Sequence, residues 1–168
     1  MSSETEASHG PLAANKRAGE LVETTVGRRV PELGLVPDDV VEHYDAVATT
    51  LVEPNADLPF AGICLLERGT VVEIKSVMVS YADGQRGRFY FRPAQHDALV
   101  DDAGVYLFVV CEATPEREIL AMKVAPATAV DDVLGDDPWL DGGHGRSDYA
   151  QLSWSRVFDE TEVSAGEP

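Results

Sequence analysis

The chain has 168 residues, 44% of them hydrophobic, which is enough for one domain with its own core. Its 30 acidic residues outnumber its 13 basic ones, and the net charge of −17 excludes a generally basic nucleic-acid-binding surface, so any basic footprint must be local. No stretch approaches the ~18 consecutive apolar residues of a membrane span. The polar start MSSETEASHG lacks the apolar segment of a secretory signal. We therefore expect a cytoplasmic protein with no membrane partner.

The basic residues are mostly arginines, and only three of the 13 are lysines. An acidic, lysine-poor composition is typical of a halophilic protein, because the counterions of a salt-rich cytoplasm screen the repulsion between its carboxylates. An ordinary acidic protein is the alternative. The composition favours the halophilic interpretation.

Along the chain, apolar residues recur first at helical spacing and then mainly at strand spacing. Helices are expected at 12–27, 37–51, 93–104 and 126–135. Strands are expected at 58–66, 70–81, 88–92, 105–112, 117–126 and 149–158. The turn ERG should join the first two strands into a hairpin, and the uninterrupted apolar run VYLFVVCE predicts a strand buried on both faces.

This order of elements predicts an α/β fold in which a mixed central β-sheet is flanked by helices. A single domain is expected over residues 12–158. The polar ends of the chain, 1–11 and 159–168, are expected to be disordered tails.

The expected strand TVVEIKSVMVSY carries an acid and a base among apolar residues. Glu73 and Lys75 are two positions apart, so both side chains project from the same face of the strand. Burying both charges without partners would cost several kcal/mol. Either this face is exposed and carries an ion pair, or Glu73 and Lys75 belong to a site with further charged groups.

Two other carboxylates are candidates for such a site. Asp57 stands at the start of the preceding expected strand and could approach Glu73 if that end of the hairpin splays. Glu20 lies on the first expected helix, where it could also be an exposed acid paired with Lys16 one turn earlier. Three carboxylates beside a lysine would suit a hard cation such as Mg²⁺, which prefers oxygen ligands.

The order of Asp57 on one strand and Glu73 and Lys75 on the next resembles the PD-(D/E)xK nuclease superfamily, which includes restriction enzymes and archaeal Holliday-junction resolvases. The resemblance covers about residues 14–112, and it includes a helix bearing Gln95 after the lysine strand. It implies an αβββαβ restriction-endonuclease-like core. The chain departs from the motif in having Ala-Asp in place of Pro-Asp and in the additional helix expected before it.

The resemblance implies a divalent-metal-dependent nuclease that hydrolyses phosphodiester bonds in DNA. Asp57, Glu73 and the backbone carbonyl of Ile74 would then hold Mg²⁺ or Mn²⁺. Glu20 would act through a water molecule or bind a second metal ion. Many nucleases of this class act as dimers, so the resemblance also makes a homodimer possible.

The same resemblance implies that the remaining residues of the motif position the attacking water and the phosphate or take part in proton transfer. Lys75 would orient or help to deprotonate the attacking water and offset negative charge on the phosphate. Gln95 would position that water or a phosphate oxygen, although it could equally be an ordinary polar residue at the start of a helix.

A group of arginines follows the Glu-x-Lys strand and could hold a polyanion. Arg86, Arg88 and Arg92 are interleaved with aromatic residues, and strand alternation places Arg88, Tyr90 and Arg92 on one face. Such a stripe suits phosphate contacts. A solvated strand face is the alternative.

Two other functions stay open on the sequence. The chain could be a catalytically inactive module of the same fold that binds nucleic acid or a protein. It could also be an α+β interaction protein without a nucleic-acid role, in which Glu73 and Lys75 form an exposed ion pair. Convergence of the site residues would separate this last alternative from the other two.

Overall fold

The computed structural model describes residues 11–37 and 43–164 of the chain. In chain order, the elements are α1 (Pro11–Arg29), β1 (Leu33–Leu35), β2 (Ala46–Ala48), β3 (Val71–Met78), β4 (Arg88–Phe91), α2 (Pro93–Asp101), β5 (Val105–Cys111), β6 (Ile119–Pro126), α3 (Ala127–Leu134), β7 (Ala150–Ser153), a 3-10 turn at Trp154–Arg156 and α4 (Glu160–Ser164).

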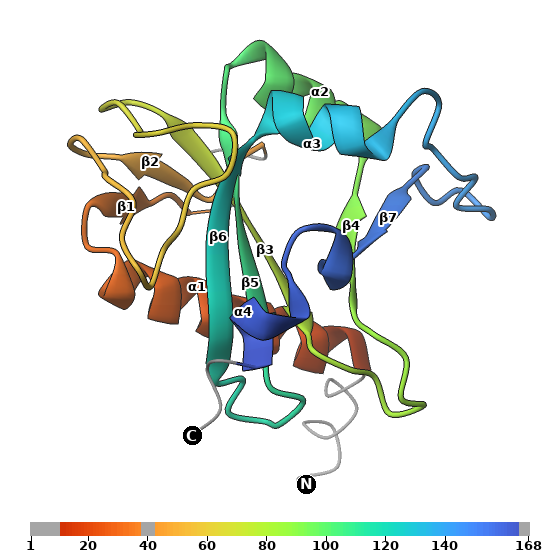
Figure 1. The fold of residues 1–168 in the computed structure, drawn as a ribbon. Helices are drawn as coiled ribbons and strands as arrows, with labels where there is room; N and C mark the ends of the chain where they lie inside the picture. Colours follow the sequence, from red (N-terminus) through yellow and green to blue (C-terminus); the bar gives the residue numbers. More distant parts are fainter. Residues whose placement is uncertain (1–10, 38–42, 165–168) are drawn as a thin grey trace, which may run out of the picture.

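A five-stranded sheet in the order β1-β2-β3-β5-β6 forms the centre of the fold (Figure 1). β3 and β5 run parallel, whereas all other neighbouring strands are antiparallel. The chain crosses from β3 to β5 through β4 and α2, because parallel strands need a long connection. This mixed sheet with flanking helices confirms the predicted α/β fold. The succession α1–β1–β2–β3–α2–β5 follows the expected αβββαβ order, with β4 inserted.

Apolar side chains cover both faces of the sheet. α1 crosses one face (Figure 1), where Val22 and Val26 are buried in the same cluster as Val72 and Ile74 of β3. A second cluster on the opposite face joins the two-stranded β4–β7 sheet to α2, α3 and β5. All seven residues of β5 are buried, as its apolar run predicted. β3 therefore has an apolar layer on each side, and the charged pair on it must be accommodated between them.

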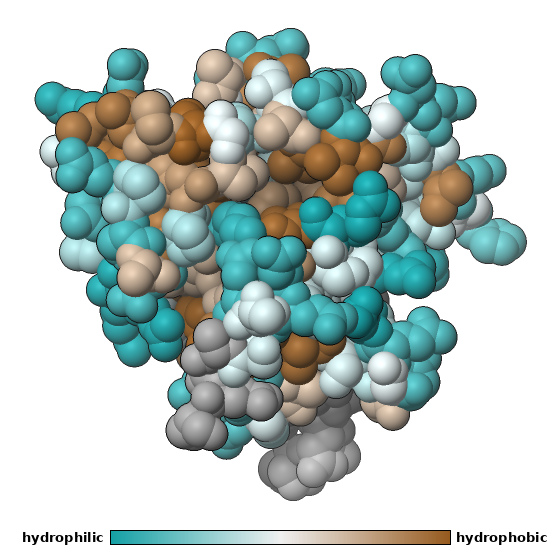
Figure 2. Space-filling model, viewed as in Figure 1, coloured by the Kyte–Doolittle hydropathy of each residue, from teal (hydrophilic) through white to brown (hydrophobic). Residues whose placement is uncertain are grey.

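The side seen in Figure 2 carries both hydrophilic and hydrophobic residues, and hydrophobic residues gather in a hollow below α3. Ala129, Val130 and Val133 of α3 line a small cavity there. None of the helices in the described part of the chain is long and apolar enough to cross a membrane.

The expected helix at 37–51 is wrong in its second half, which contains β2. Residues 38–42 lie outside the described residues. Ala46 and Ala48 are both buried and alternate with the half-buried Val47, so this segment has strand and not helix periodicity. Pairing with β1 and β3 outweighs the helix propensity of alanine.

The expected strand at 58–66 is also wrong, since this segment is a loop with isolated bridges. Phe60 bridges to Val124 of β6, and Leu66 bridges back to Val52. Gly62 adopts a φ of 75°, which interrupts an extended strand. The antiparallel partner of β3 is therefore β2, and the segment that contains Asp57 runs beside β6.

The C-terminal part of the chain differs from the expectation in two ways. β7 ends at Ser153, and the 3-10 turn takes up the next part of the strand expected at 149–158. The segment 159–168, expected to be a disordered tail, contains α4 in its described part. α4 packs through the buried Val163, and its Glu162 forms an ion pair with Lys123 of β6.

A buried histidine anchors α2 to its neighbours. The His96 ring is 1% exposed, and its Nδ1 lies 2.7 Å from the Tyr106 hydroxyl of β5. Its Nε2 lies 2.9 Å from Oδ1 of Asp131 on α3. A ring protonated at Nε2 satisfies both contacts, because it donates to Asp131 and accepts from Tyr106. Since Gln95 precedes His96 on the helix, the same contacts fix the position of Gln95.

We predict that His96→Leu lowers the free energy of unfolding by about 2 kcal/mol, because it leaves the buried Tyr106 hydroxyl without a hydrogen-bond partner. Denaturant-induced unfolding measures this change. Asp97→Asn, on the exposed side of α2, is the matched control and should change stability by less than about 0.5 kcal/mol. A His96→Leu protein as stable as the wild type would contradict the anchoring role.

Candidate active site

The site begins where β2 separates from β3. The Asp45 N–H donates to the Val72 carbonyl at 2.9 Å, directly before the start of β2. Oδ2 of Asp45 accepts a hydrogen bond at 2.8 Å from the Ile74 N–H, which is the next backbone amide along this edge of β3. The carboxylate thus occupies the place that a further residue of β2 would take. Because the N–H and C=O of one strand residue point the same way, the Ile74 carbonyl faces this edge as well.

Glu73 and Lys75 project from β3 into the layer beneath α2 and β4. Glu73 is only 6% exposed, and its Oε1 lies 3.8 Å from the Lys75 Nζ. Lys75 donates to Oε1 of Gln95 at 3.2 Å, and its ammonium lies 5.6 Å from the centre of the Phe91 ring. The structure therefore brings together three of the residues that the sequence indicated, Glu73, Lys75 and Gln95.

The electrostatics of the cluster disfavour charge on both β3 residues. Burial is the main reason why the pKa of Glu73 rises from 4.5 to about 9; Lys75 opposes this rise, and the neighbouring carboxyls of Asp45 and Glu23 add to it. Burial also lowers the pKa of Lys75, although Glu73 and Asp45 act in the opposite direction. A cation placed between Asp45 and Glu73 would relieve the carboxyl repulsion.

The donor set fits a divalent cation. Oε2 of Glu73 is buried and has no hydrogen-bond partner, which leaves one carboxylate oxygen available as a ligand. In the described part of the chain, no three His, Cys, Asp or Glu side chains are grouped tightly enough to enclose a metal on their own. Mg²⁺ does not need such a cage, because it is commonly held by one or two carboxylates and keeps several waters. Asp45, Glu73 and the Ile74 carbonyl meet that requirement.

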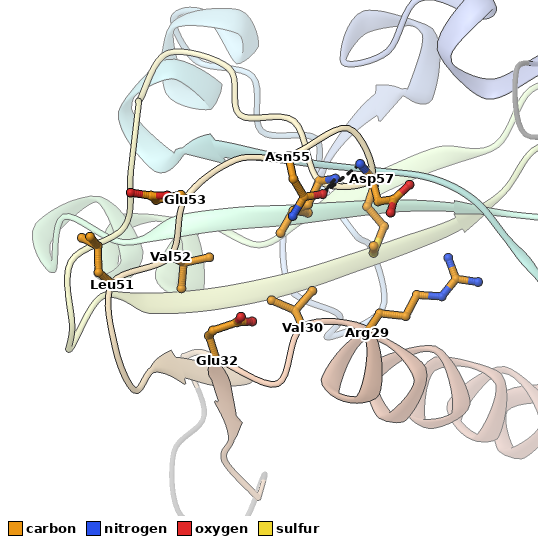
Figure 3. Close-up of a pocket in the computed structure, with 10 residues that line it drawn as sticks. Arg29, Val30, Glu32, Leu51, Val52, Glu53, Asn55 and Asp57 are labelled. Atoms are coloured by element: carbon orange, nitrogen blue, oxygen red, sulfur yellow. Dashed lines mark hydrogen bonds between the residues drawn. The ribbon is translucent and has the colours of Figure 1, made fainter.

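Asp57, the aspartate expected in the site, lies elsewhere in the structure. It is exposed and lines a pocket together with Arg29 and Asn55, whose Oδ1 accepts the Asp57 N–H at 2.9 Å (Figure 3). The segment after it pairs with β6, which is separated from β3 by β5. Asp45, which contacts the Ile74 N–H and acts on the pKa of Glu73, lies where Asp57 was expected, so Asp45 takes its place as the candidate aspartate.

Glu20 likewise does not take part in the cluster as described. Its side chain is exposed on α1, and its carbonyl accepts the Thr24 hydroxyl. Glu23, three residues later, is half-buried and lies close enough to raise the pKa of Glu73. Glu23 is therefore the α1 acid that acts on Glu73, and it replaces Glu20 as the candidate.

The arginines on and around β4 have different surroundings. Arg86 forms an ion pair with Glu160 of α4, and its guanidinium lies 5.5 Å from the centre of the Trp154 ring. Arg88 donates to Gln151 at 3.1 Å, and Arg92, at the start of α2, is close enough to lower the pKa of Lys75. Arg88 and Arg92 are thus exposed near the site, whereas Arg86 already has an anionic partner.

The sequence contained a signal for Asp45 that the helical interpretation of 37–51 concealed. Asp45 directly precedes Ala46, Val47 and Ala48, whose alternating burial is that of a short strand. A strand assignment there would have placed an aspartate directly before the first residue of the strand.

We predict that Glu73→Gln stabilises the metal-free protein as the pH rises. Because the pKa of Glu73 is higher in the folded protein than in the unfolded chain, the protonated carboxyl contributes to the free energy of unfolding. This contribution is fully present below the unfolded-state pKa near 4.5, and it is lost as the pH rises towards 9. Glutamine does not titrate, so only the wild type loses this contribution. With a chelator present, the free energy of unfolding of the variant relative to that of the wild type should therefore increase by about 1 kcal/mol or more between about pH 5 and about pH 8. Denaturant unfolding at both pH values measures it. Glu20→Gln on exposed α1 is the control, and a relative loss of stability for Glu73→Gln at the higher pH would contradict the prediction.

Comparison with known proteins agrees with this geometry. The family model described as a PD-(D/E)XK nuclease superfamily domain matches residues 9–159. No curated protein and no solved structure matches the chain. The match is to the superfamily as a whole, so the relation to Holliday-junction resolvases stays a prediction. Residues 9–159 include every element of the central sheet and the cluster around Asp45, Glu73 and Lys75, and the chain belongs to the PD-(D/E)XK nuclease superfamily.

Proposed function

We propose that the chain is a divalent-metal-dependent nuclease that hydrolyses phosphodiester bonds in DNA. The observation that carries the proposal is the burial of Lys75 beside the candidate metal ligands. Its ammonium is largely buried between Glu73 and Gln95, next to a pair of carboxyls with an oxygen free to bind a cation. A buried lysine in such a place costs stability, and chemistry is the usual reason to retain one.

Asp45, Glu73 and the Ile74 carbonyl would hold Mg²⁺ or Mn²⁺, and Glu23 would act through a water molecule. A bound divalent cation would neutralise charge on the scissile phosphate and lower the pKa of a water molecule. The buried position of Glu73 excludes competing solvent from its free oxygen. Asp45 is kept in place by the Ile74 N–H, so the two carboxyls have a fixed spacing along the strand edge.

Lys75 would orient the attacking water and exchange a proton with it. Burial brings the pKa of Lys75 down from its ordinary value, which makes the neutral amine more accessible at neutral pH. In its charged form, the same group offsets negative charge on the phosphate. Gln95 holds the ammonium at 3.2 Å and thereby restricts where Lys75 can point.

The outward face of β4 would contact the nucleic-acid backbone on both sides of this site. Arg88 and Tyr90 line one groove, along β3, and Arg92 lines a second pocket together with Gln95 and His43. The first groove includes Ser76, the neighbour of Lys75, and the second includes Gln95 itself. In a chain with a net charge of −17, Arg88 and Arg92 supply the local basic surface that a polyanion needs.

The other two functions have less support. Burial of Glu73 and Lys75 argues against an exposed ion pair on an interaction protein. A catalytically inactive module would have no need for an aligned lysine, glutamine and carboxyl pair, and activity measurements separate it from the nuclease.

We predict that the protein cleaves labelled DNA in the presence of Mn²⁺ or Mg²⁺ in concentrated KCl, which would keep a halophilic chain folded. Lys75→Ala and Asp45→Asn should each lower the rate by at least about 100-fold, since each removes a group that acts on the reacting atoms. Asp57→Asn is the matched control and should keep the rate within about twofold of the wild type.

Gel-based cleavage rates with duplex, branched and single-stranded substrates measure these effects, and circular dichroism checks that each variant is folded. If Asp57→Asn abolished cleavage and Asp45→Asn did not, the assignment of the aspartate would be overturned. If the folded wild type cleaved none of the substrates, the inactive binding module would replace the nuclease.

A further inference from the structure

A groove lies between the C-terminal half of β3 and α1, directly beside the candidate site. Ser76, which follows Lys75, lines the groove together with Val22 of α1, which precedes Glu23. The groove has a volume of about 320 Å³. That volume is at the lower end of the range for small-molecule pockets and suits a single nucleotide better than a double helix.

The two walls of the groove have different chemistry. On the α1 side, Ala18 and Gly19 leave room, and a Cβ added at Gly19 would meet no atom within 4 Å. On the β4 side, Tyr90 presents an aromatic ring that is 52% exposed, and Arg88 lies beside it. An aromatic ring next to a guanidinium is the combination that binds a base by stacking and the adjoining phosphate by charge.

Hydrogen bonds hold the tyrosine wall in place. Gln151 of β7 donates to the Tyr90 hydroxyl at 2.6 Å and accepts from Arg88 at 3.1 Å. The Arg88 N–H in turn donates to the hydroxyl of Tyr81, which also lines the groove. The Tyr149 ring supports Tyr90 at a centroid distance of 5.8 Å. The exposed ring is therefore pre-positioned, which lowers the entropy that stacking would cost.

We propose that this groove binds the base of an unpaired nucleotide next to the scissile phosphate, so that the substrate is single-stranded DNA or a single-stranded part of a larger DNA. The proposal rests on the proposed nuclease function and deepens it. Tyr90 stacks on the base, Arg88 contacts the adjoining phosphate, and the small residues of α1 provide the space. A base that is paired in a duplex cannot enter, because its faces are already stacked on its neighbours.

Binding to DNA with Mn²⁺ present tests the proposal, with Lys75→Ala as the non-cleaving background. The probe is an oligonucleotide of about 12 nucleotides, within the site sizes of single-strand binders, that carries one 2-aminopurine as a stacking reporter. Gly19→Leu fills the groove from the helix side, and Tyr90→Ser removes the ring. Their matched controls are Gly19→Ala, which adds only a methyl group, and Tyr90→Phe, which keeps the ring.

The single strand should bind at least tenfold more tightly than the blunt duplex of the same sequence. Gly19→Leu and Tyr90→Ser should each weaken single-strand binding by about tenfold and restore the 2-aminopurine fluorescence. Gly19→Ala should stay within about twofold, and Tyr90→Phe, which keeps the ring but loses the hydrogen bond from Gln151, should weaken binding by less than Tyr90→Ser does. Equal or tighter binding of the duplex would overturn the proposal. So would a Gly19→Leu protein that binds the single strand as well as Gly19→Ala does.

Cleavage by proteins that retain Lys75, measured in parallel, separates this inference from the proposed function. If nothing is cleaved but single-strand binding responds to Gly19→Leu, the groove is supported and the nuclease is not. If the wild type cleaves DNA but Gly19→Leu cleaves single strands equally fast, the nuclease stands and the groove assignment is overturned.

Discussion

One hydrogen bond, from the Ile74 N–H to the Asp45 carboxylate, determines where the site of this protein forms. It lies where the pairing of β2 with β3 ends, and no strand in residues 11–37 and 43–164 pairs with this edge of β3 beyond that point. It also sets the Asp45 carboxyl beside that of Glu73, on adjoining strands. A continuous β2 would have covered this edge and excluded both a cation and a phosphate. The interruption of the sheet is therefore the feature on which the proposed chemistry depends.

The fold tolerates the cost of this arrangement because the rest of the domain is apolar and well packed. Glu73 and Lys75 lie in a layer otherwise built from aromatic and aliphatic side chains, and neither charge is favoured there. Their mutual contact and the Gln95 amide compensate only in part. The proposed function explains why this unfavourable burial is retained, because the cluster would have to take up a cation and release a proton. The anchoring of α2 through His96 serves the same end, since it keeps Gln95 from relaxing away.

The sequence predicts the candidate residues whose placement follows from the alternation of side chains along one strand. It does not predict those whose placement depends on which segments of the chain pack together in the fold. Glu73 and Lys75 share a face because strand side chains alternate, whatever the partner strand is. The aspartate depends on which segment pairs with β3, and the apolar run after Asp57 resembles a strand more than the short alanine-rich segment after Asp45 does. Glu20 and Glu23 are almost one turn apart on α1, and the sequence does not decide which of them approaches Glu73, because packing fixes the rotation of a helix against a sheet. The same limit applies to the fold, where long apolar strands were recognised and β2 was not.

The most direct test of the central claim is the location of a bound Mn²⁺ ion by its anomalous X-ray scattering in crystals grown with MnCl₂. The account predicts a peak between the carboxyl groups of Asp45 and Glu73, within coordination distance of the Ile74 carbonyl. A peak at Asp57 beside Arg29, or a fully ordered structure in which Asp45 and Glu73 bind no ion at saturating Mn²⁺, would contradict it.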